Sequence, residues 1–82
     1  MKAKNKRKIK EVDLPESARR VLSFMIDREN EYNLFCSYEL LERHCGEDAG
    51  EGLDYLLKRK LVNFDESYCM YFATADGERV AA

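Results

Sequence analysis

Hydrophobic residues near the start of the chain recur at the spacing of an amphipathic α-helix. Between residues 14 and 26, apolar side chains return every three or four positions, so they share one side of a helix of about four turns. They are Leu14, Ala18, Val21, Leu22, Met25 and Ile26. The helix should start near Pro15, with Asp13 as a candidate N-cap, because a proline in the first turn loses no hydrogen bond. The polar stretch 27–33 contains two asparagines, which favour turns, and should end the helix.

Two shorter helices are predicted to follow. After a brief strand-like step at 34–36, the Ser37 hydroxyl can accept a backbone N–H from the first turn of a helix over Tyr38–Cys45. Gly46 permits the next turn, and a third helix is expected over about 48–60. Its inward positions have helical spacing and are Ala49, Leu53, Leu56 and Leu57.

The last part of the chain has the pattern of a β-hairpin. A strand over 61–64, an acidic turn over 65–67 and an aromatic-rich strand over 68–73 are predicted in succession. Residues 74–77, Thr-Ala-Asp-Gly, then end the hairpin and begin a short helical turn that reaches Val80.

Alternation along the second strand separates its side chains into two sets. One set is Tyr68, Met70 and Phe72, and the other is Cys69, Tyr71 and Ala73. A hairpin of two strands can bury only one face against helices. The other face should therefore be exposed, where its aromatic residues would suit a dimer or a partner interface.

Composition limits what the chain can be. Its 82 residues allow one domain with a modest core. The formal net charge is -2, yet residues 1–10 hold six basic residues and no acid. Removing those 6 from the 14 basic residues leaves 8 against 16 acids, so residues 11–82 carry a net -8. We therefore predict a disordered basic arm over 1–12, whose like charges repel, and a folded acidic domain over 13–82.

The sequence offers no recognisable catalytic or metal-binding pattern. Its three cysteines, Cys36, Cys45 and Cys69, lack C-x-x-C spacing, which favours buried thiols in a reducing compartment over disulfides. His44 and the cysteines do not have the ligand spacing of a structural zinc site. With no nucleophile elbow or phosphate-binding glycine loop either, we expect neither an enzyme nor a cofactor. The chain shows no signal peptide and no membrane-spanning apolar run, so a cytoplasmic location is expected, or a nuclear one in a eukaryote.

Two segments carry a resemblance to a known superfamily. They are Leu53-x-x-Leu56-Leu57-x-x-x-Leu61-Val62 and Tyr71-Phe72-Ala73-Thr74-x-x-Gly77. In this order, after two helices, they resemble the end of the recognition helix and the exit from the wing in winged helix-turn-helix proteins, in particular small regulators related to MarR and ArsR. The resemblance covers residues 14–80 and implies an α+β domain with three helices and a short β-hairpin wing. One departure is Lys60, where many members have a glycine in the left-handed conformation; a lysine adopts it at a small cost.

The resemblance implies a DNA-binding transcriptional regulator that acts as a homodimer. Its third helix would enter the major groove, where an outward tyrosine could stack on a base, and the arm and the end of that helix would contact phosphates. The candidate nucleic-acid-binding residues are Lys4, Lys6, Arg7, Lys8, Lys10, Tyr55, Lys58 and Arg59.

The charge of the third helix also supports a different kind of partner. Projection at about 100 degrees per residue places six side chains away from the leucine face, and four of them are acids. The six are Glu47, Asp48, Glu51, Asp54, Tyr55 and Lys58. Each acid opposes phosphate binding, and an i,i+4 pair between Asp54 and Lys58 would cancel the nearest cation. The alternative is a protein-interaction winged helix that docks a partner through this acidic helix or through its aromatic hairpin.

Overall fold

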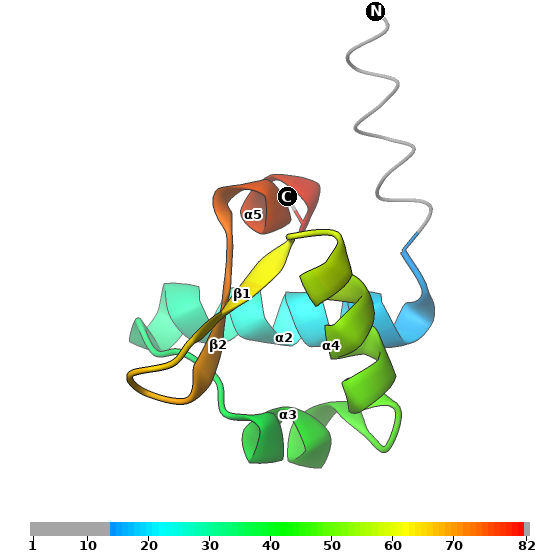
Figure 1. Cartoon of the computed structure of the whole chain (residues 1–82), viewed down its shortest axis with the longest axis horizontal. Coiled ribbons are helices and arrows are strands. Elements are labelled where there is room, and N and C mark those ends of the chain that lie inside the picture. The colour runs from blue at the N-terminus through cyan, green and yellow to red at the C-terminus, as the bar shows by residue number, and fades with distance from the viewer. Residues whose placement is uncertain (1–13, 82) are drawn as a thin grey trace, which may run out of the picture.

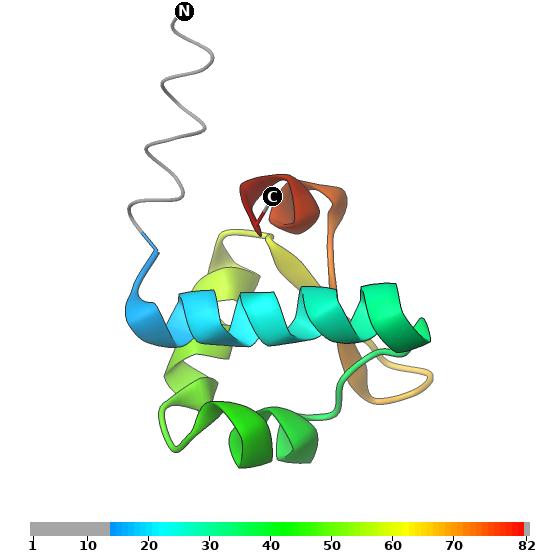
Figure 2. The ribbon, with the colours of Figure 1, turned by 180° about the vertical axis from the view of Figure 1, so that it is seen from behind.

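The computed structural model describes residues 14–81, which form a small α+β domain. The helices in this range are α2 (Glu16–Tyr32), α3 (Tyr38–Cys45), α4 (Ala49–Lys58) and α5 (Ala75–Ala81), and the antiparallel strands are β1 (Val62–Asp65) and β2 (Met70–Ala73). In Figure 1 the hairpin and α4 lie in front of α2, with α3 below and α5 above, and Figure 2 shows α2 from the opposite side. The order of elements follows the prediction, except that the expected last turn is a seven-residue helix, α5.

Helix α2 is longer than the sequence pattern predicted. It continues through most of the polar stretch 27–33 and ends only at Asn33, which takes the left-handed conformation (φ 58) and donates its backbone N–H to the Glu29 carbonyl. The hydrogen bond from Ala73 of β2 to the Glu29 carboxylate holds this last part of α2 against the hairpin and explains the extension, because tertiary contacts stabilise a helix more than local propensity does. Pro15 precedes the first residue as expected, whereas Asp13 and the arm 1–12 lie outside the described residues.

The ends of α3 and α4 follow local chemistry that the sequence predicted. The Ser37 hydroxyl accepts the Leu40 backbone N–H at 3.2 Å, which caps α3. Helix α4 ends in a Schellman motif, in which Leu61 N–H bonds the Leu56 carbonyl at 2.9 Å. At its centre Lys60 has φ 63, so the expected left-handed lysine is confirmed.

The hairpin is shorter than predicted on its second strand. Cys69 is left-handed (φ 55), so it belongs to the turn, and β2 begins at Met70. Tyr68 therefore does not share a strand face with Phe72, which corrects the predicted set. The expected strand-like step at 34–36 is one bridge, in which Cys36 and Tyr71 exchange backbone hydrogen bonds of 3.0 and 2.7 Å.

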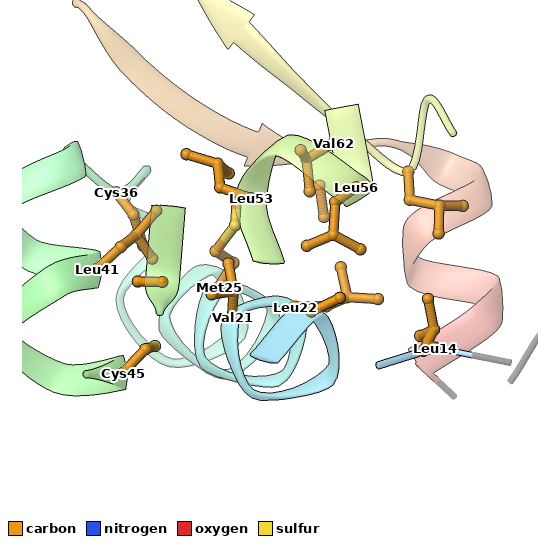
Figure 3. Close-up of a cluster of buried hydrophobic side chains, with 14 of the residues drawn as sticks. Leu14, Val21, Leu22, Met25, Cys36, Leu41, Cys45, Leu53, Leu56 and Val62 are labelled. Carbon is orange, nitrogen blue, oxygen red and sulfur yellow. The ribbon is translucent and has the colours of Figure 1, made fainter. Parts of the chain in front are cut away.

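The hydrophobic core lies where α2 crosses α4, with contributions from every other element. Figure 3 shows side chains from α2, α3, α4 and β1 meeting there, with Leu14 beside α5. Its buried members include Val21, Leu22, Met25, Leu41, Leu53, Leu56 and Val62. Leu57, predicted to face inward, is half-buried and packs on the edge of this cluster.

Two glycines allow backbone segments to come closer than any side chain would permit. A Cβ at Gly52 of α4 would lie 2.5 Å from the Ser17 carbonyl oxygen of α2. A Cβ at Gly77 of α5 would collide with the Leu61 carbonyl oxygen. These positions therefore fix how closely α4 meets α2 and how α5 meets the start of β1.

Candidate nucleic-acid interface

A long-range ion pair fixes the N-terminal end of α4. Arg20 of α2 lies 3.2 Å from the Asp48 carboxylate and donates a second hydrogen bond, at 3.0 Å, to the Cys45 carbonyl. Asp48 occupies the N-cap position of α4 but makes no capping bond there. Its carboxylate thus joins the α3–α4 turn to α2, a role that nothing in the local sequence indicates.

The outer surface of α4 is acidic over its first half. Glu47, Glu51 and Asp54 are exposed. Lys58 is exposed too, and its Nζ lies 3.1 Å from an Asp54 oxygen, which is the i,i+4 pair that the spacing predicted. A pair this exposed contributes little to stability, so Lys58 can exchange Asp54 for another anion at small cost.

Tyr55 does not lie free on that surface, although helical projection placed it there. Its side chain is half-buried and packs against the hydrophobic core. The Arg59 guanidinium carbon lies 4.5 Å from the centroid of its ring, in cation–π contact. The structure therefore brings Tyr55 and Arg59 together as one packed pair, and the tyrosine is not available as an outward anchor.

Three consecutive exposed cations, Lys58, Arg59 and Lys60, form the C-terminal end of α4. We call them the basic end. In both views this end lies on the α5 side of the molecule, whereas α3 and the start of α4 lie on the other (Figures 1 and 2), and the first described residue, Leu14, lies beside α5 (Figure 3). The predicted arm residues lie outside the described residues; they are Lys4, Lys6, Arg7, Lys8 and Lys10.

Charge is therefore separated along the axis of α4. Acids occupy its beginning and cations its end, which complements the helix macrodipole and stabilises the helix itself. Folding alone thus favours this distribution, independent of any ligand. The acidic hairpin turn also has a structural role, because Asp65 Oδ1 accepts the Ser67 backbone N–H at 2.8 Å.

The three thiols differ in exposure. Cys36 and Cys45 are buried, whereas Cys69 is exposed in the hairpin turn, so the prediction of buried thiols is wrong for Cys69. Burial raises the pKa of Cys36 to about 11, against the opposing effect of the Arg28 charge. Burial also raises the pKa of Cys45. Both core thiols are therefore held in the neutral form.

Comparison with known proteins gave no match: no family model, no curated protein and no solved structure matches this chain. Within residues 14–81 there is no group of three or more His, Cys, Asp or Glu side chains that could hold a metal ion. The helices of the same range are too short or too polar to cross a membrane.

Proposed function

We propose that this chain is a winged-helix protein that binds nucleic acid, DNA in the first instance, through the basic end of α4 and the basic arm. The order of elements supports the fold assignment, since α2, α3 and α4 are followed by a hairpin in the position of a wing. A single bridge between Cys36 and Tyr71 stands where the strand-like step was expected between the first two helices. In this assignment α4 is the recognition helix.

The observation that carries the proposal is the placement of the basic end. Lys58, Arg59 and Lys60 are exposed together on the α5 side of the domain, where the first described residue, Leu14, also lies (Figures 1 and 3). Cations that neutralise phosphates release condensed counterions, which supplies most of the affinity of sequence-independent binding. We propose that the basic end supplies such cations and that the six basic residues of 1–10 add to them.

The acids on α4 limit how the basic end could contact a duplex. Insertion of the first turns into the major groove would bring Glu51 and Asp54 close to phosphates, where each opposes binding. Contact through the end of the helix avoids that repulsion. We therefore propose binding that follows the phosphate backbone, with little sequence preference and a steep dependence on salt.

The test is fluorescence anisotropy of a labelled mixed-sequence duplex, titrated with the full chain over a range of salt. Lys58→Gln is expected to weaken binding and to lower the slope of log K against log salt by about 0.9, the value for one lost phosphate contact. Arg43→Gln removes the same charge from an exposed position on α3, away from the basic end, and serves as the matched control. Absence of binding at low salt, or an equal loss in both variants, would contradict the proposal.

Protein docking is the second candidate. The half-burial of Tyr55 leaves the acidic surface of α4 without an exposed aromatic anchor, so the hairpin is the surface that favours this candidate. Charge reversal at Glu51 and Asp54 tests the helix separately, because a protein partner held there would be lost while one held by the hairpin would remain.

A further inference from the structure

The outer face of the hairpin carries an aromatic pair. Phe35 and Phe72 stack with ring centroids 5.0 Å apart, and Phe35 remains 36% exposed. Met70 lies two residues from Phe72 on the same side of β2, and exposed Asn63 is the cross-strand partner of Phe72. We call Phe35, Asn63, Met70 and Phe72 the aromatic face.

The strand register explains why this face is not part of the core. Val62 and Ala73 are opposite each other and buried, so they mark the side of the sheet that packs on the helices. Side chains alternate along a strand, so Phe72 and its partner Asn63 point to the other side.

Three of the outward N–H donors of the hairpin are already hydrogen-bonded. On β2, Tyr71 N–H bonds the Cys36 carbonyl, and Ala73 N–H bonds the Glu29 carboxylate at 2.9 Å. On β1, Phe64 N–H bonds its neighbour's side chain, Asn63 Oδ1, at 2.8 Å. An added strand would find few donors to pair with. A partner that covers the aromatic face should therefore satisfy its own backbone hydrogen bonds, as a helix does.

Acids lie at the turn and at the β2 edge beside this face. Asp65 and Glu66 lie at the turn, and Glu29 lies at the β2 edge, where the charge of Glu78 is close enough to act on it. Arg28 has the opposite charge, and its guanidinium carbon lies 5.8 Å from the centroid of the Tyr32 ring. The rim is therefore predominantly negative.

We infer that the aromatic face docks an amphipathic helix of a partner protein, with apolar side chains on Phe35 and Phe72 and with lysines or arginines facing the acidic rim. The apolar centre supplies desolvated area, and the rim selects the charge of the partner. This site uses residues distinct from the basic end of α4. It therefore adds a protein contact to the proposed nucleic-acid contact.

The experiment uses the full chain and a labelled helical peptide of leucine and lysine, with leucine at i, i+3, i+4 and i+7. A second peptide has glutamine in place of every lysine. Anisotropy is expected to give tighter binding of the lysine peptide. Phe35→Ser should weaken it about tenfold, as for loss of one central aromatic residue. Tyr68→Ser, which alters a residue 70% exposed outside this face, should leave the affinity unchanged.

A second variant keeps the test informative if Phe35→Ser fails to fold. Asn63→Lys puts a positive charge at an exposed position on the face, with loss of the Asn63 Oδ1 hydrogen bond, and should also weaken binding of the lysine peptide. Unchanged binding in both variants, or equal affinity for the glutamine peptide, overturns the inference. Sedimentation equilibrium that shows self-association lost with Phe35→Ser would assign the face to a second copy instead. Competition by duplex DNA at this face would assign it to nucleic acid.

Discussion

The carboxylate of Glu29 accepts a hydrogen bond from the backbone N–H of Ala73 at 2.9 Å, although the two residues are 44 positions apart. The bond takes the place that a longer strand at 34–36 would have filled at the edge of β2. Burial raises the pKa of Glu29, the bond from Ala73 opposes the rise, and the charge of Glu78 adds to it. The net pKa lies above the ordinary glutamate value of 4.5.

This relationship predicts a pH dependence of stability. Between 4.5 and its folded pKa, Glu29 binds more protons in the native chain than in the unfolded one, so its contribution to the free energy of unfolding falls as pH rises. Glu29→Gln keeps an acceptor oxygen without the charge. It should be more stable than wild type at neutral pH, with the difference lost below 4.5 in urea unfolding. Glu31→Gln, an exposed neighbour, is the control. A less stable Gln variant at neutral pH would show that the charged hydrogen bond outweighs desolvation.

Two glycines of α4 should respond oppositely to alanine. Gly52→Ala forces a Cβ against the Ser17 carbonyl and should destabilise the domain by about 1–3 kcal/mol, because the backbone of α2 cannot move aside as a flexible side chain can. Gly50→Ala meets only the Tyr38 hydroxyl, the end of a flexible side chain, and should be neutral or stabilising by up to about 1 kcal/mol through helix propensity. Chemical denaturation of both variants measures the difference. Similar values for the two would refute the close approach of α2 and α4.

Lys60 links helix termination to the proposed function. At φ 63 a lysine is strained by about 1–2 kcal/mol, whereas glycine costs about 0.5–1 kcal/mol in conformational entropy. Lys60→Gly should therefore stabilise the domain by up to about 1 kcal/mol and also reduce the salt slope of DNA binding by about 0.9. Lys60→Val, with the same loss of charge, should destabilise it. Thermal unfolding measures the change in stability, and the binding titration measures the change in salt slope.

The thiols should react in two classes. In the native chain an aromatic disulfide reagent should modify Cys69 rapidly, whereas the core thiols Cys36 and Cys45 should react only after unfolding. Cys69→Ser should abolish the rapid phase, and urea should release three reactive thiols in the wild type. Rapid modification of the Cys69→Ser variant would mean that the core opens readily.

Features set by neighbours in the sequence could be predicted. The Ser37 cap depends on groups within one helical turn, so the residue type alone indicates it. The left-handed Lys60 was expected only because the resemblance places it where many family members have glycine. The hairpin turn is also local, yet its extent was misjudged, because Cys69 has no residue-type preference for positive φ.

Features set by distant residues could not be predicted. Arg20 could have paired with any of several acids, and only the crossing of α2 with the α3–α4 turn selects Asp48. The half-burial of Tyr55 likewise depends on the core cluster against which its side chain packs, which helical projection ignores. Because the candidate surfaces consist of such pairs, their charge was easier to predict than their accessibility.

The separation of charge along α4 gives the molecule an electric polarity as well as a binding surface. In the field of any polyanion the domain would rotate so that Lys58 and its neighbours lead and Glu47 and Glu51 trail. Productive orientation would thus be selected before contact, so added salt should slow association more than it hastens release.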